Sequence, residues 1–145
     1  MPRPIRAAAL VSLAGLLLGV LAPGAPVRAQ AFRAPESVKM GLETLNKVVI
    51  DSGRLIEARS YDQLPQQSDR FEAGMAALEQ GLGQGASPFR KQIEPLLARA
   101  RVAASAMSEA VRSHRTAMLP VAHRQLADAV GALIALFPPG MRPGP

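Results

Sequence analysis

The sequence contains no cysteine and no tryptophan, and its aromatic residues are one tyrosine and four phenylalanines. Without cysteine the chain has no disulfide, no thiolate metal site and no thioether-linked haem. Its two histidines, His114 and His123, are too few and too far apart for a zinc motif. So few aromatic side chains leave little to stack on bases, and we expect no nucleic-acid partner.

Enzyme signatures are also lacking. Serine, histidine and acidic residues do not occur in a nucleophile-elbow arrangement. Neither histidine has a glutamate three residues before it, which excludes the Glu-x-x-His pair of di-iron bundles. The glycines at 81, 83 and 85 follow no predicted strand and precede no Lys-Ser/Thr pair, so they do not form a phosphate-binding loop. We therefore expect a protein without enzyme activity.

The N-terminus has the three parts of a secretory signal peptide, which we assign to residues 1–30. Two non-adjacent arginines precede an uncharged apolar run, Ala7–Ala22. Prolines then break the helix, and small residues predict cleavage after Ala29 or Ala31. The alternative is a retained membrane anchor, but this run is shorter than the ~20 apolar residues that span a bilayer. The pattern predicts Sec-dependent export to a bacterial periplasm.

The positive charge lies in the C-terminal half. The chain has 17 basic and 11 acidic residues. Three of the basic residues lie in the signal segment, and the remaining 14 against 11 give a net charge of +3. Residues 83–145 contain 8 basic and 3 acidic side chains. Peripheral contact with an anionic membrane is one interpretation, and a solvated arginine-rich face is the other.

Apolar residues recur with helical spacing in four segments, and no segment alternates as a strand does. This predicts an all-α domain at 31–138, an antiparallel four-helix bundle, followed by a flexible tail at 139–145. The predicted helices are 35–59, 62–82 and 88–115, and a fourth that begins at Thr116 or Pro120 and ends at Phe137.

Several details of these helices follow from local signals. Asp62 is the predicted N-cap of the second helix. Pro95 predicts either a kink in the third helix or a start near Glu94. The first helix has an apolar seam at 38, 42, 45, 49, 52 and 56, and the third has one at 93, 97, 100, 104, 107, 111 and 114. The fourth helix is apolar on most faces, which predicts a central position or cover by a partner. A homodimer is therefore left open.

Imidazole and thioether groups near one predicted turn suggest a cofactor site. His114 lies on the seam of the third helix, His123 lies near the start of the fourth, and Met118 lies between them. Nitrogen and sulfur together favour soft or borderline metals such as copper. The alternative is that the histidines bond to backbone or water, while methionines fill gaps in the core.

Two short stretches carry a family resemblance. The sequence Pro35-Glu36-Ser37-Val38-Lys39, together with the turn Ser60-Tyr61-Asp62-Gln63, resembles the cytochrome c-prime family of exported four-helix-bundle haem proteins. The resemblance implies the bundle and the compartment. The family's two thioether cysteines and axial histidine would fall on Leu133, Leu136 and Phe137, so the usual haem attachment is excluded and these side chains are expected to fill core space. Met40, near the family's distal ligand position, is predicted to point away from the core.

The interpretation that best combines these observations is a haem-less, cytochrome c-prime-like bundle that acts as a periplasmic binding or interaction protein. Its partner would be an unknown protein or a small ligand. The alternative is a carrier that holds haem or copper non-covalently through His114, His123 or Met118 and serves electron transfer.

Overall fold

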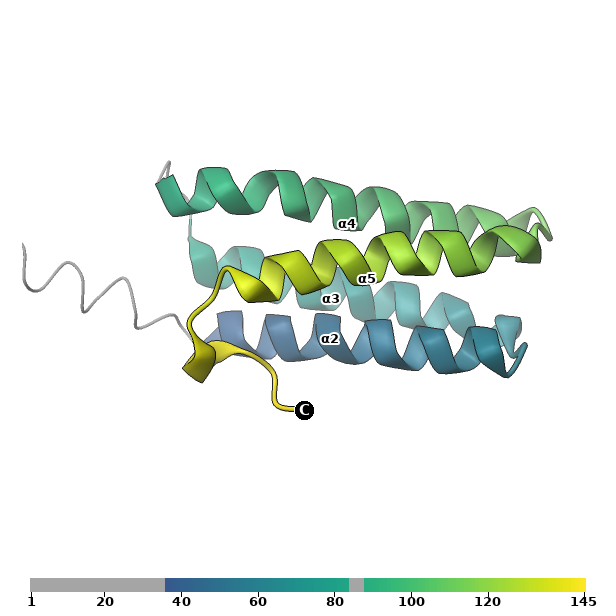
Figure 1. Cartoon of the computed structure of the whole chain (residues 1–145), viewed down its shortest axis with the longest axis horizontal. Coiled ribbons are helices and arrows are strands. Elements are labelled where there is room, and N and C mark those ends of the chain that lie inside the picture. Colours follow the sequence, from purple (N-terminus) through teal and green to yellow (C-terminus); the bar gives the residue numbers. More distant parts are fainter. Residues whose placement is uncertain (1–35, 84–87) are drawn as a thin grey trace, which may run out of the picture. The chain divides into compact units, whose positions relative to one another are not determined.

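The computed structural model describes residues 36–83 and 88–145, and every regular element in them is helical (Figure 1). The predicted all-α class is thereby confirmed for these residues. The predicted signal peptide, residues 1–30, lies outside the described residues. The α-helices are α2 Glu36–Glu57, α3 Leu64–Leu82, α4 Pro88–Arg112 and α5 Leu119–Ala135, and the 3-10 helices are η1 Tyr61–Gln63, η2 Thr116–Met118 and η3 Pro139–Met141.

The four α-helices lie lengthwise beside one another, and the α2–α3 and α4–α5 turns lie at the same end (Figure 1). Both α2 and α4 contact α3 and α5. The start of α2 packs against the end of α3, where Val38 meets Gly81. A Cβ atom at Gly41 would come within 2.8 Å of the Leu78 nitrogen, so only glycine allows this close approach of α2 to α3.

Each helix buries one stripe of apolar side chains, spaced three or four residues apart as the sequence predicts. Two seam positions of α2, Val49 and Ile56, are only half-buried, and Val48 is buried instead. The reason is that a straight helix drifts from a strict seven-residue repeat by about 20° per heptad. The same drift leaves Ala104 and Val111 of α4 half-buried. The buried side chains of the core are Val38, Leu42, Leu45, Val48, Leu64, Phe71, Met75, Leu78, Ile93, Leu97, Ala100, Ala103, Met107, Ala110, Leu119, Ala122, Leu126, Ala129, Val130, Leu133 and Phe137.

The two turns end their helices in the same way. Arg59 and His114 each adopt the left-handed conformation, with φ of 56°. In the first turn the Arg59 N–H donates to the Ile56 carbonyl, and the Ser60 N–H donates to the Leu55 carbonyl. This pair of bonds is the Schellman motif. The second turn repeats both bonds, from His114 and the residue after it.

Each turn continues into a 3-10 helix and then into an α-helix that begins with Leu-Pro, at Leu64–Pro65 and at Leu119–Pro120. The predicted N-cap at Asp62 is therefore wrong, because this exposed residue lies within η1. Proline lacks an N–H and suits the first turn of a helix, so each α-helix begins beside its proline without a side-chain cap.

A constant step of 55 residues, from Arg59 to His114, relates the two turns and also the helices around them. The α2–α3 and α4–α5 hairpins thus form an internal structural repeat, although few of the paired residues are identical. Pairs that are buried in both hairpins include Val38 and Ile93, Leu42 and Leu97, Leu45 and Ala100, Val48 and Ala103, Ser52 and Met107, Leu64 and Leu119, Gln67 and Ala122, Phe71 and Leu126, and Leu78 and Leu133.

The start of α4 agrees with the predicted helix 88–115, and its end does not. The helix begins at Pro88 and continues through Pro95, so a start near Glu94 is wrong. Pro95 is exposed, and the carbonyl that it leaves without a helical partner belongs to the exposed Lys91. At the other end the helix stops at Arg112, because the left-handed residue at 114 cannot continue it.

The C-terminal residues are bound to the end of α5. Phe137 is buried, and its ring packs edge-to-face against Phe89 at a centroid distance of 5.3 Å. The guanidinium of Arg142 donates to the carbonyls of Phe137 and Ala135, at 2.8 and 3.0 Å. Met141 packs against the core. The first residues of the predicted tail, 139–142, therefore make defined contacts.

Candidate functional site

His114 does not lie on a buried seam. It is exposed, in the turn that follows α4, because the helix ends at Arg112, three residues earlier than predicted. An exposed imidazole carries no desolvation cost that a ligand would have to offset. His114 is therefore not a buried group that needs a cofactor to satisfy it.

His123 is directed toward α2. Its Nε2 atom lies 2.8 Å from the carbonyl oxygen of Val49, and because a carbonyl only accepts, the ring donates this hydrogen bond. The imidazole packs over Gly53, where a Cβ atom would lie 3.0 Å from Cε1 of the ring. The half-buried ring thus fills the space between α5 and α2.

The third predicted ligand, Met118, has 55% of its surface exposed at the end of η2, whereas Met107 is buried in α4. His114 and Met118 are both exposed and lie in the segment between α4 and α5. His123 lies in α5, and its side chain is hydrogen-bonded to α2. Within residues 36–83 and 88–145 no three histidine, aspartate or glutamate side chains gather as a metal-ligand group.

A pocket of about 250 Å³ lies in the half of the domain that is nearer the two turns. All four α-helices contribute to its wall, and its exposed lining residues belong to α3 and α4, so its mouth lies between these two helices. The apolar part of the wall consists of Val48, Leu64, Phe71, Ala104, Met107, Val111 and Leu126.

Two of the residues that line this pocket each carry a buried polar atom without a hydrogen-bond partner in the described part of the protein: Oγ of Ser52 and Oε1 of Gln67. Ser52 and Gln67 are also the only buried polar side chains among these residues. A buried polar atom without a partner costs about 1–3 kcal/mol. Their shared location therefore makes the pocket the best candidate for a binding site.

The sequence contains a signal for both residues. Gln67 follows Leu64 by three residues and precedes Phe71 by four, which is core spacing on a helix. Ser52 likewise occupies a core position of α2. A polar residue at a position that should be apolar is the pattern that distinguishes a functional core position from a structural one.

The mouth of the pocket is polar but carries no net charge. The hydroxyls of Ser68 and Ser108 are hydrogen-bonded across it at 2.9 Å. Asp69 and Arg112 line its outer edge, and both are exposed. Arg112 is also paired with Glu109 at 2.8 Å. The interior has no ionisable side chain, so it offers no counter-charge to an ionised ligand.

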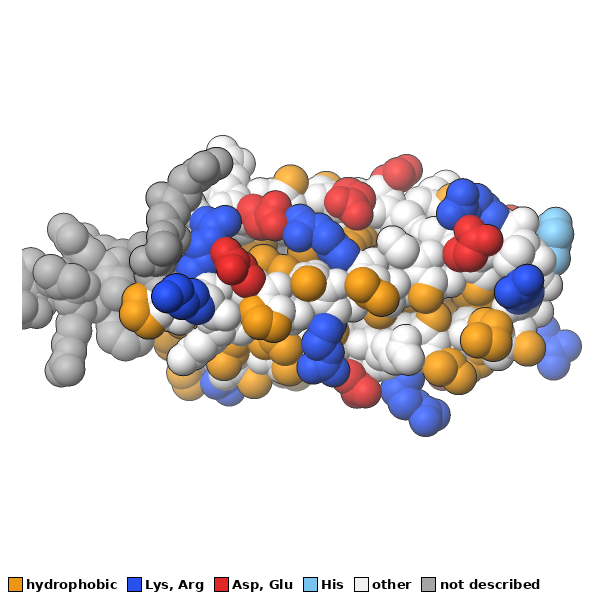
Figure 2. Space-filling model, turned by 90° about the horizontal axis from the view of Figure 1, so that it is seen from above, with side chains coloured by type: hydrophobic (Ala, Val, Ile, Leu, Met, Phe, Trp, Pro, Cys, Tyr) orange, Lys and Arg blue, Asp and Glu red, His pale blue; other side chains and the backbone are white. Residues whose placement is uncertain are grey.

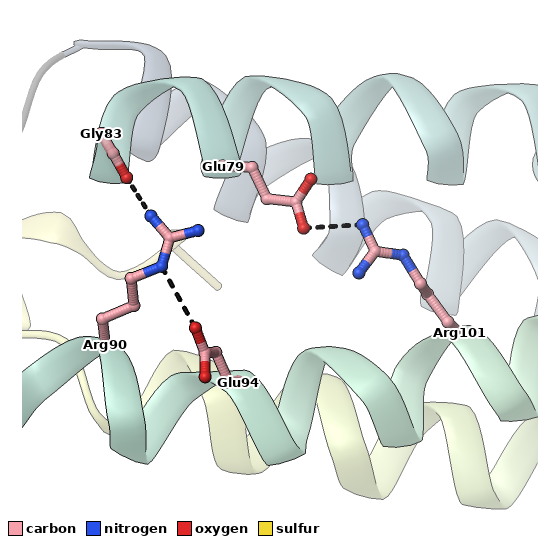
Figure 3. Close-up of polar contacts among 5 residues, drawn as sticks. All are labelled: Glu79, Gly83, Arg90, Glu94 and Arg101. Atoms are coloured by element: carbon pink, nitrogen blue, oxygen red, sulfur yellow. Dashed lines mark hydrogen bonds and ion pairs between the residues drawn. The ribbon is translucent and has the colours of Figure 1, made fainter. Parts of the chain in front are cut away.

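Away from the pocket, polar contacts bridge α3 and α4 toward the opposite end of these helices (Figure 3). Arg101 bonds Glu79 at 2.6 Å between the two helices. Arg90 bonds the carbonyl of Gly83 and pairs with Glu94 at 3.3 Å. The Arg101–Glu79 and Arg90–Gly83 contacts therefore join α3 to α4 at the end of these helices that lies away from the pocket.

Basic and acidic side chains alternate along the α4 face of the domain, with apolar side chains between them (Figure 2). Two ion pairs that involve α4, Arg101–Glu79 and Arg112–Glu109, also join side chains of opposite charge. The excess of arginine in residues 83–145 therefore does not produce a continuous basic surface on the face shown.

Compared with known proteins, the chain matches no family model, no curated protein and no solved structure. Among the described helices none is both long and apolar enough to cross a membrane.

Proposed function

We propose that this chain is an exported binding protein, an antiparallel four-helix bundle that takes a small uncharged molecule into the pocket between α3 and α4. The observation that carries the proposal is that two lining residues of one cavity, Ser52 and Gln67, hold buried polar atoms without a partner, while the rest of its interior is apolar. Ligand sites combine apolar walls with a few polar groups that fix orientation.

Export to the periplasm rests on the signal-peptide pattern of residues 1–30. The antiparallel order is supported by the contact of Val38 with Gly81, which sets the start of α2 against the end of α3. The haem-less, cytochrome c-prime-like character rests on the two stretches of sequence near Pro35 and Tyr61. Burial of Leu133 and Phe137 supports the idea that apolar side chains fill the space where relatives of that kind would attach haem.

Binding fits this site better than catalysis does. Neither Ser52 nor Gln67 has a histidine or carboxylate bonded to it that would activate it as a nucleophile or base. The ionisable groups at the mouth, Asp69 and Arg112, are exposed. A non-covalent haem or copper carrier remains the alternative. His123 Nε2 is engaged with Val49, and His114 and Met118 are exposed, so this alternative has less support.

The proposal is tested by nuclear magnetic resonance with a panel of small neutral aromatic and aliphatic alcohols, amides and heterocycles. We expect members of the panel to shift the methyl signals of Met107, Val111 and Leu126, which line the pocket, but not those of Leu133 at the other end of α5. The absence of any saturable shift at the pocket for the whole panel would refute the proposed function.

A matched pair of variants locates the site. Ala104 lines the pocket, whereas Ala98 lies on the same helix and is exposed. Ala104→Leu fills the cavity and is expected to abolish the shifts, while Ala98→Leu leaves them unchanged. Equal effects of the two substitutions would place binding elsewhere.

A further inference from the structure

The internal repeat shows what occupies the equivalent of this pocket in the other half of the domain. The step of 55 residues pairs Ser68 with His123, and it pairs Gly53 with Ser108. Between α5 and α2 the His123 ring packs over Gly53. Between α3 and α4 the paired residues are the two serines, whose hydroxyls bond each other at the mouth of the pocket.

The pocket between α3 and α4 therefore corresponds to the space between α5 and α2 that the flat ring of His123 fills. That ring donates an N–H to the Val49 carbonyl. The residue paired with Val49 is Ala104, which lines the pocket. At the equivalent place in the repeat, the His123 ring thus packs against its neighbours and also donates one hydrogen bond.

Size and chemistry of the pocket extend this comparison. An engineered cavity of about 150 Å³ holds benzene, so about 250 Å³ corresponds to roughly ten non-hydrogen atoms. This is the size of two fused rings. Phe71 and Met107 supply surfaces that pack favourably on an aromatic ring. Oε1 of Gln67 can only accept, so the ligand has to supply a donor.

From these observations we infer that the pocket binds a neutral bicyclic heteroaromatic molecule that donates one N–H or O–H to Gln67. This inference rests on the proposed binding function and specifies its ligand. The apolar rings pack between Phe71 and Met107, and the donor satisfies an acceptor that otherwise stays unpartnered. The uncharged interior excludes ionised relatives of the same molecule.

The test compares indole with 1-methylindole, which has the same rings but no donor, by calorimetric titration of the purified protein. Indole is expected to bind roughly three- to tenfold more tightly, the range that one hydrogen bond provides. Gln67→Met keeps the volume and removes the acceptor, so the two affinities should become equal. Gln66→Met, at the adjacent exposed position, should preserve the difference.

A second variant closes the pocket by copying the other hairpin. The double substitution Ser68→His with Ser108→Gly reproduces the His123 and Gly53 pair, and it should abolish indole binding. Ser105→His, on the exposed side of α4, is the control and should leave binding intact. Thermal unfolding of each variant shows that it is folded.

The outcomes separate this inference from the proposed function. Equal affinity of wild-type protein for indole and 1-methylindole overturns the requirement for a donor but leaves a binding pocket. Tighter binding of indole-3-acetate than of indole overturns the requirement for neutrality. Retention of indole binding in the Ser68→His, Ser108→Gly variant overturns the assignment of the ligand to this pocket.

Discussion

The Nε2 atom of His123 lies 2.8 Å from the carbonyl oxygen of Val49, so this side chain joins α5 to α2. Its removal deletes a part-buried hydrogen bond and leaves space above Gly53. We expect His123→Ala to lower the free energy of unfolding by about 1–3 kcal/mol, measured by chemical denaturation.

His114 provides the comparison for this effect. Its side chain is exposed, so His114→Ala loses little packing. We expect a change smaller than that of His123→Ala. A larger loss at 114 than at 123 would contradict the placement of both rings.

The left-handed residues of the two turns predict a stabilising substitution. Arg59 and His114 both have φ of 56°, which side chains with a Cβ adopt at a cost. Glycine is the preferred residue at this position of a Schellman motif. Arg59→Gly and His114→Gly should each raise the free energy of unfolding by about 0.5–1 kcal/mol.

Because the two turns are equivalent in the repeat, the two glycine substitutions should have similar effects. Glycine at Ser113, one residue before His114 and without positive φ, is the control and should not stabilise. Thermal melting of the three variants checks this. Stabilisation at only one of the two turns would show that they are not equivalent.

Substitutions that remove a buried polar atom at the pocket should raise the free energy of unfolding while they weaken ligand binding. Gln67→Met and Ser52→Ala each remove a buried polar atom that has no partner in the described residues. Removing such an atom relieves its desolvation cost, so each variant should be about 1 kcal/mol more stable than wild type. Denaturation in the absence of ligand measures this, and a loss of stability at both positions would show that these atoms are already satisfied.

The helices and most of their buried positions could be predicted from the spacing of apolar residues. The family resemblance predicted that Leu133, Leu136 and Phe137 fill core space, and of these Leu133 and Phe137 are buried whereas Leu136 is half-buried. The pocket could not be predicted, because its volume depends on how four helices meet rather than on any one pattern. Ser52 appeared in the predicted seam of α2, but spacing alone treats it as a small core residue. Its missing partner becomes visible only when Gln67 is placed across the same cavity.

The contact of His123 with Val49 could not be predicted from the sequence either. It depends on Gly53, which lies on another helix and makes room for the ring. The repeat left one visible trace, the two Leu-Pro pairs at Leu64 and Leu119. Few other paired residues are identical, so the equivalence of the hairpins emerges from turn geometry and burial.

The end of α5 is predicted to be structural. Leu133 and Phe137 are buried, and Phe137 also packs against Phe89. Leu133→Ala and Phe137→Ala should each lower the free energy of unfolding by about 2–5 kcal/mol in chemical denaturation. Leu136→Ala, at the half-buried position between them, should cost less. Losses below about 1 kcal/mol at both buried positions would instead indicate a partner surface.

The last prediction distinguishes the binding protein from the metal or haem carrier. His123 donates its Nε2 proton to Val49, which leaves Nδ1 as the ring's remaining acceptor, whereas His114 and Met118 are exposed in one turn. Exposed ligands that are not held by neighbouring groups bind metals weakly, because ordering them costs conformational entropy. Calorimetric titration with Cu(I) and with haem is therefore expected to show no saturable binding in the wild-type protein. Micromolar or tighter binding that disappears in His114→Ala or His123→Ala would favour the carrier over the proposed function.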